Sequence, residues 1–187
     1  VFILASLLKL PLAYLTILSR YLKSIITPLT SRCMQALYNA SVGILHGAVL
    51  QGTNELGDYR GGIVFDMVAY LGKIHVPLYC NSLMNSNEII RVLKGAVALG
   101  GWCVLKSPEK LEINVAQVVA TIVSQVQIAF QEKCKNIYVG DEYIQFRKPA
   151  FFFATRKISN RSFLSMTQGF APIQFSRPNF GSLIRKI

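Results

Sequence analysis

Short apolar runs along this chain alternate with longer segments in which apolar residues recur every three or four positions. The short runs lie at residues 43–50, 76–80, 103–105 and 150–154. Continuous apolar runs of this length are typical of strands that are buried on both faces. Strands that alternate with helices predict an α/β fold, in which a mostly parallel sheet is flanked by helices.

The helical periodicity is strongest after residue 113, where Val115, Val119 and Ile122 begin a stripe that continues to Phe130. Asn114 is expected to be the N-cap of this helix. Further helices are expected over residues 30–41, 63–72 and 85–99. Thr30 or Ser31 can cap the first of these, and Gly72 is expected to end the second.

Three other segments complete the predicted order of elements. Residues 25–30 should be extended, because Thr27 precedes a proline. Residues 137–146 predict a β-hairpin that turns at Gly140-Asp141. The end of the chain is rich in turn residues and predicts a short helix near Ser182.

The first 18 residues are strongly apolar, but Lys9 and Pro11 interrupt them. This run is borderline for a membrane span, and it lacks the basic region and cleavage site of a signal peptide. The chain also begins with valine, which suggests a fragment of a longer polypeptide. We expect helices over residues 4–23 that pack on another part of that polypeptide, with a membrane anchor as the alternative.

The chain has a net charge of +11, from 20 basic and nine acidic residues. All nine acids lie between Glu55 and Glu142, so the charged residues at both ends of the chain are all basic. Basic residues interleaved with Phe can bind RNA. No recognised RNA-binding motif accompanies them, and an edge that meets acidic partners in a larger assembly is the simpler interpretation. We do not expect DNA as a partner.

Neither the cysteines nor the histidines form a pattern that predicts chemistry. Cys33, Cys80, Cys103 and Cys134 are far apart, without a C-x-x-C pair, so we expect no zinc site and a reducing compartment. His46 and His75 lie in or near apolar strands. No nucleophile or acid is spaced to partner either histidine, and a core or surface role is expected for both.

The end of the third strand carries unexpected residues. A nucleotide hydrolase of this layout places two acids there, one for Mg²⁺ and one for the attacking water. This chain has Lys106 and Ser107 instead. Lysine has the wrong charge for Mg²⁺, and a serine hydroxyl is too weak a base to replace a carboxylate. Glu109 is the sole nearby acid, and Pro108 places it beyond the strand.

A glycine-rich loop at residues 52–62 lies between the first strand and a helix, which is the setting of a phosphate-binding loop. The G-x-x-x-x-G-K-[ST] pattern itself is absent. Gly57, Arg60, Gly61 and Gly62 are the residues that a degenerate nucleotide site would use. An ordinary surface turn is the favoured interpretation of this loop, since its acids would repel phosphate.

An ordered series of short motifs resembles the first AAA+ module of dynein heavy chains, which is the hydrolytic ATP-binding region of that family. The motifs are ITPLTSRC at 26–33, LYCNS at 78–82, LKGA at 93–96, GGW at 100–102 and FSRP at 175–178. The resemblance spans residues 20–180 and implies the large subdomain of a P-loop NTPase-like AAA+ fold over residues 25–187. Residues 1–24 then form a separate apolar helical segment.

The departures from the family affect its catalytic residues. The family's loop lysine and threonine correspond to Arg60 and Gly61, and its paired acids to Lys106 and Ser107. Its sensor asparagine corresponds to Arg156. Arg177 alone remains, similar to the family's arginine-finger region. With these residues lost together, the chain resembles a divergent, degenerate member of the family, such as a dynein heavy chain domain-containing protein.

The resemblance therefore implies a non-hydrolytic module with a structural or docking role in a microtubule-based assembly. We expect no catalytic residue, metal or bound cofactor. The alternatives are an ATP-hydrolysing dynein module with ATP or ADP and Mg²⁺, a nucleotide binder without hydrolysis, and a basic RNA-binding domain. Expected partners are neighbouring AAA+ modules of the same chain and dynein-complex or axonemal proteins. The expected location is the cytoplasm and cytoskeleton, in the axoneme of a cilium or flagellum.

Overall fold

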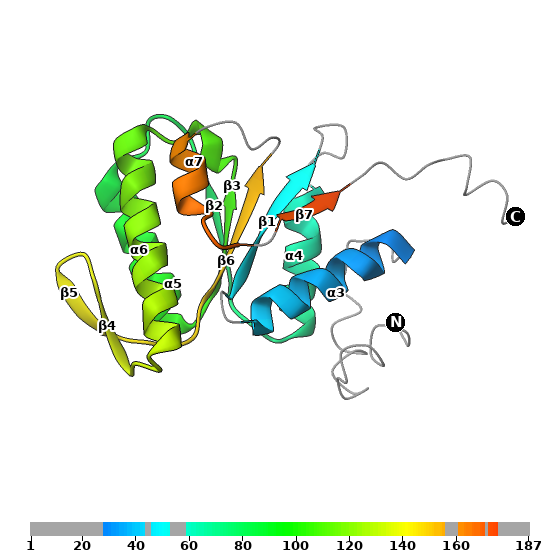
Figure 1. Ribbon diagram of the computed structural model, residues 1–187, viewed down its shortest axis with the longest axis horizontal. Helices are drawn as coiled ribbons and strands as arrows, with labels where there is room; N and C mark the ends of the chain where they lie inside the picture. Colours follow the sequence, from blue (N-terminus) through cyan, green and yellow to red (C-terminus); the bar gives the residue numbers. More distant parts are fainter. Residues whose placement is uncertain (1–27, 44–45, 53–58, 156–160, 171, 176–187) are drawn as a thin grey trace, which may run out of the picture.

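The computed structural model describes residues 28–43, 46–52, 59–155, 161–170 and 172–175. Five of its strands form one sheet in the order β2-β3-β6-β1-β7, and every neighbouring pair is parallel (Figure 1). These strands are β1 (Gly47–Gly52), β2 (His75–Tyr79), β3 (Trp102–Lys106), β6 (Ala150–Thr155) and β7 (Pro172–Phe175). The predicted parallel α/β fold is confirmed.

Helices cover both faces of this sheet (Figure 1). One face carries α3 (Pro28–Val42) and α4 (Tyr59–Tyr70), and the other carries α5 (Ser86–Leu99), α6 (Ile113–Gln131) and α7 (Arg161–Met166). Successive side chains of a strand point to opposite faces. Val104 and Phe152 accordingly pack with α3 and α4, whereas Cys103 and Phe153 pack with the other three helices.

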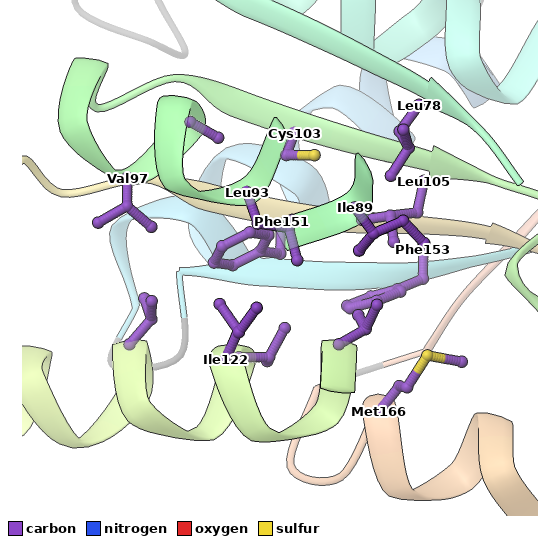
Figure 2. Close-up of a cluster of buried hydrophobic side chains, with 14 of the residues drawn as sticks. Leu78, Ile89, Leu93, Val97, Cys103, Leu105, Ile122, Phe151, Phe153 and Met166 are labelled. Atoms are coloured by element: carbon purple, nitrogen blue, oxygen red, sulfur yellow. The ribbon is translucent and has the colours of Figure 1, made fainter. Parts of the chain in front are cut away.

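The central strand β6 explains why the strands appear in the sequence as unbroken apolar runs. All six of its residues are buried. Phe151 and Phe153 point toward Ile122 of α6, beside side chains of α5 (Figure 2). On the opposite face, the ring of Phe152 lies 5.3 Å from that of Trp102, centroid to centroid. Both faces of β6 are therefore core.

The helix that begins the described chain corrects one prediction. Residues 28–30 belong to α3 and are helical, so the prediction of an extended segment through residue 30 is wrong there. Proline is tolerated in a first helical turn because its missing N–H has no helical partner there. The residue that Pro28 restricts is Thr27, which lies outside the described residues.

The start of the long helix α6 also differs from the prediction. Its N-cap is Glu112, with an extended backbone at φ −61° and ψ 152°, and Asn114 already lies inside the helix. Leu111 just before it is buried against the core, after the 3₁₀ turn Pro108–Lys110. Packing of this turn, which capping preferences do not include, sets where the helix begins.

Other boundaries follow the predictions within a few residues. The helix α5 corresponds to the expected helix at 85–99. Gly72 adopts φ 61° after the end of α4, and the N–H of Lys73 bonds to the carbonyl of Val68 at 3.0 Å. The strand β1 starts at Gly47, four residues later than expected, and α4 starts at Tyr59, four residues earlier than expected.

The predicted hairpin is confirmed as β4 (Asn136–Val139) and β5 (Glu142–Gln145), with Gly140 at φ 63° in the turn. The short elements α7 and β7 were not predicted. They have six and four residues, too few to show a period. The helices expected at residues 4–23 and near Ser182 lie outside the described residues.

Among the described helices, α6 is long and apolar enough to span a membrane by length and composition. In this fold its buried side chains, including Val119 and Val123, cover one face of the sheet. The core helix of a soluble domain has the same composition. The apolar run at residues 1–18 lies outside the described chain.

Candidate functional site

Three central strands end at the same edge of the sheet, which is the upper edge in Figure 1. Their last residues are Gly52 of β1, Lys106 of β3 and Thr155 of β6. Lys106 pairs with Ala154, one residue before the end of β6. Open parallel sheets bind ligands beyond the carboxyl ends of their strands, so this edge is the candidate site.

The side chain of Lys106 extends over the edge strand β2. Its Nζ donates a hydrogen bond to the Tyr79 hydroxyl oxygen at 3.1 Å and lies 4.5 Å from the centroid of the same ring. Strand β3 lies between β2 and β6 in the sheet. The ammonium group is therefore on the side of β3 away from β1, the strand that precedes the glycine-rich loop.

The chain turns sharply after Lys106. Ser107 adopts the left-handed conformation, with φ 53° and ψ 49°, and its N–H bonds to the Ala154 carbonyl at 2.9 Å. A left-handed backbone is uncommon for a residue other than glycine. Pro108 then begins the 3₁₀ turn, so the residues after β3 leave the plane of the sheet.

Glu109, the acid nearest in sequence, lies in this turn. Its Oε2 atom is buried and has no hydrogen-bond partner. Burial and then the Glu109 carboxylate raise the pKa of the Cys80 thiol to about 12. Cys80 is the residue that follows β2, and its side chain belongs to the core on the α5 and α6 face. Glu109 therefore faces the end of β2.

On the other side of the site, α4 follows β1 after the glycine-rich loop and begins at Tyr59. Its first turn contains Arg60, Gly61 and Gly62, and a Cβ added at Gly62 would meet nothing within 4 Å. A helix N-terminus beyond a parallel strand favours anions through its free N–H groups and its dipole. The side chains of Arg60 and Gly61 are outside the described residues.

The structure thus brings some of the predicted site residues to one edge. Lys106 and Ser107 end β3, and the first turn of α4 contributes Arg60, Gly61 and Gly62. Gly57, Arg156 and Arg177 lie outside the described residues. The last described residue of β6, Thr155, is fully buried, and position 156 follows it directly.

Sequence reasoning gave no role to Tyr79 or Asp66. Tyr79 ends β2, and the only signal for its role is an exposed aromatic residue, 63% accessible, at the end of an edge strand. Asp66 is a buried acid within the apolar stripe of α4. Burial and then the Asp66 charge raise the pKa of the Tyr70 hydroxyl. Asp66 lies well inside α4, away from the turn that faces the site.

Both histidines pack against aromatic rings. The ring of His46 stacks on Phe130 with centroids 3.6 Å apart, and His75 meets Phe65 edge-on at 5.3 Å. Burial lowers the pKa of each imidazole. A nearby lysine lowers it further, Lys148 for His46 and Lys106 for His75.

The described part of this edge does not fit Mg²⁺. Magnesium requires hard oxygen ligands in octahedral geometry, usually including a carboxylate. An ammonium group stands at the end of β3, and the carboxylate that follows it faces Cys80. Among the described residues, no group of three or more His, Cys, Asp and Glu side chains could hold a metal. We therefore derive no step through a metal ion.

The parallel sheet, the helix that follows the loop after β1, and the site at the carboxyl edge define an α/β AAA+ domain of P-loop-like fold. A family model described as the hydrolytic ATP binding site of the dynein motor region matches residues 14–168. The chain belongs to this dynein family, and the resemblance found in its sequence is confirmed.

Individual relatives agree with this assignment. The chain is 29% identical to human dynein axonemal heavy chain 8 over 147 residues, which is 79% of this chain. It is also 29% identical to mouse dynein axonemal heavy chain 3 over 119 residues, or 63% of this chain. The chain spans 3% of the length of each of these relatives.

Proposed function

We propose that this AAA+ module does not hydrolyse ATP and serves as a structural or docking element of a dynein-type heavy chain. One observation supports the proposal: the Lys106 ammonium stands at the end of β3 and donates a hydrogen bond to the Tyr79 hydroxyl. In the family, this position carries the first of the paired acids. Replacing that acid by lysine reverses the charge where hydrolysis requires a cation.

The size of this effect can be judged from Coulomb's law. Two unit charges 4 Å apart interact by about 4 kcal/mol near a protein surface, and a divalent cation doubles this value. An acid at this position would attract Mg²⁺ by about this amount, whereas Lys106 supplies no attraction and its ammonium meets Tyr79 instead. Ser107 has no charge that could compensate. The proposed loss of the family's residues at the positions of Arg60, Gly61 and Arg156 would also work against ATP hydrolysis.

The assembly that we propose follows from the relatives, which are named axonemal dynein heavy chains. The module would lie in a cilium or flagellum, in contact with neighbouring AAA+ modules and with dynein-complex proteins. Residues 25–187 would form the module and residues 1–24 an apolar helical extension. Arg156 and Lys157 would pair with acidic groups of a neighbouring module, and Arg177 would keep the place of the family's arginine finger.

A second candidate function is nucleotide binding without hydrolysis. It is favoured by the N-terminus of α4, which begins just after the loop that follows β1 and carries Arg60 in its first turn. Arginine binds phosphate well and needs no metal to do so. In this case nucleotide would bind whether or not Mg²⁺ is present.

The test is the binding of a fluorescent ATP analogue to the 187-residue chain, with and without Mg²⁺, together with phosphate release. Lys106→Asp restores the family's acid at the end of β3. Lys110→Asp makes the same charge change on an exposed residue of the next turn and serves as the control. Circular dichroism should show that all three proteins are folded.

We expect no phosphate release, and no binding of the analogue with or without Mg²⁺, for the unchanged chain and for Lys110→Asp. A Mg²⁺ effect that appears only in Lys106→Asp would show that the lysine excludes the metal. Binding that is equal with and without Mg²⁺ would support the second candidate. Micromolar binding that Mg²⁺ strengthens in the unchanged chain, with phosphate release, would overturn the proposal.

A further inference from the structure

A cavity lies at the opposite edge of the sheet, where the amino ends of the strands are found. Its volume is about 640 Å³, within the usual range of ligand sites, roughly 300–1,000 Å³. It lies between the carboxyl ends of α3 and α6 and is bounded by the segment that leads into β6. None of its described lining residues belongs to the candidate site at the carboxyl edge of the sheet.

The walls of this cavity combine aromatic rings with two amines. Phe130 stacks on His46 and meets Phe146 edge-on, with ring centroids 4.9 Å apart. Lys133 and Lys148 also line the cavity, and none of the described residues that line it is acidic. The pKa of His46 is lowered by burial and by Lys148, so its ring is neutral near pH 7 and adds an apolar surface.

Two of the lining residues have an uncommon backbone conformation. His46 and Lys133 adopt φ 44° and 54°, and of the described non-glycine residues only Ser107 shares this positive φ. Such residues persist where the surrounding structure holds them, and they are enriched at binding sites. Here they turn the chain directly after α6 and directly before β1, which places both side chains at the cavity.

The charges around the cavity indicate what it can bind. Lys133, Lys135, Arg147 and Lys148 lie in the segments that form it, against the single carboxylate of Glu132. Each of the two helix ends adds the equivalent of about half a negative charge. The balance is positive but modest, which suits one or two carboxylates better than a polyanion.

From these contacts we propose that the cavity binds an acidic peptide segment that carries an aromatic side chain. The aromatic side chain would enter the cavity and pack against the Phe130 and Phe146 pair, and flanking carboxylates would meet Lys133 and Lys148. The aromatic wall suits the aromatic side chain and the two amines suit its flanking carboxylates, whereas a free phosphate would use the amines alone.

The experiment is fluorescence anisotropy of labelled peptides with the full 187-residue chain. The probes are Ser-Asp-Phe-Asp-Ser, the same peptide with Ser in place of Phe, and Ser-Lys-Phe-Lys-Ser. A labelled oligouridylate tests nucleic acid. The variant Lys133→Glu with Lys148→Glu reverses both charges, and Lys73→Glu with Lys110→Glu is the matched control, on exposed lysines that do not line the cavity.

We expect the acidic Phe peptide to bind at least tenfold more tightly than the other two peptides. The double charge reversal should weaken the binding of this peptide at least tenfold. The affinity of the control variant should stay within twofold of that of the unchanged chain. Gln131→Trp provides a second test, because it fills the cavity from an exposed position of α6 and leaves the charges intact. This variant should also fail to bind the acidic Phe peptide.

Three results would overturn the proposal. The first is equal binding of the Phe and Ser peptides, which would mean general charge attraction. The second is binding that survives both the charge reversal and Gln131→Trp, which would place the ligand elsewhere. The third is oligouridylate binding that exceeds peptide binding and is lost on charge reversal, which would make the cavity part of a nucleic-acid surface.

Discussion

The ammonium nitrogen of Lys106 lies 3.1 Å from the hydroxyl oxygen of Tyr79 and 4.5 Å from the centre of its ring. One amine thus makes a hydrogen bond and a cation–π contact with a single side chain. Together they connect the end of β3 to the exposed edge strand β2. We expect this contact to stabilise the fold.

The contact predicts a measurable loss of stability in Lys106→Met. An exposed cation–π contact contributes about 0.5–1 kcal/mol, and a hydrogen bond adds roughly 0.5–1.5 kcal/mol. We expect the free energy of unfolding in urea to fall by about 1 kcal/mol after solvent screening. Lys110→Met, on an exposed neighbour, should change it by less than about 0.5 kcal/mol. Equal effects of the two substitutions would contradict a specific role of the contact.

The start of β1 predicts opposite effects for two glycine substitutions. A Cβ at Gly47 would overlap the Phe151 carbonyl and lie 2.7 Å from the Phe170 ring, whereas at Gly95 it would meet nothing within 4 Å. Gly47→Ala should destabilise the fold by about 1–3 kcal/mol or more. Gly95→Ala, in the interior of α5, should stabilise it by about 0.5–1 kcal/mol.

Urea unfolding followed by fluorescence can measure both substitutions, since Trp102 is the chain's single tryptophan and is buried against Phe152. Unfolding should expose Trp102 to water and shift its emission to longer wavelength. A Gly47→Ala protein as stable as the unchanged chain would mean that β1 and β6 are not packed as closely as described.

The histidines predict that stability falls in mild acid. Burial and then Lys106 lower the pKa of His75 in the folded chain below its ordinary value of 6.5. As the pH falls through 6.5, the unfolded chain therefore binds protons before the folded chain does, and the fold loses stability. His46 behaves in the same way, through burial and Lys148.

The measurement compares the urea midpoints at pH 7.5 and pH 5.5. The double variant His46→Gln with His75→Gln should lose less stability between these two pH values than the unchanged chain. Carboxylates contribute equally to both proteins and cancel in the comparison. A double variant with the same loss would show that the histidines do not titrate differently in the folded and unfolded chain.

The cysteines predict an order of chemical labelling. Burial raises the pKa of Cys103 to about 12, and burial with Glu109 does the same for Cys80. At pH 8 only about one molecule in 10⁴ then carries either thiolate, which is the reactive form. Cys134 is half-buried, so iodoacetamide should reach it first in the native chain. Labelling of all four at similar rates, followed by mass spectrometry, would contradict the described core.

Local patterns predicted the parts of the fold that depend on neighbours in sequence. The run from Ala150 to Ala154 indicated a buried strand, and Gly140-Asp141 indicated the hairpin turn; both are confirmed. The cap at Asn114 was wrong, because packing of Leu111 decided where α6 starts. The elements α7 and β7 were missed because short segments carry no period.

The amino-acid order alone established an α/β domain of the dynein AAA+ family with a lysine at the end of its third strand. It could not show that this amine turns toward β2, nor that His46, Phe130 and Lys148 enclose a cavity at the opposite edge. Both features join residues that are far apart along the chain. Their proximity depends on the strand order β2-β3-β6-β1-β7, which is set by the packing of both faces of the sheet together.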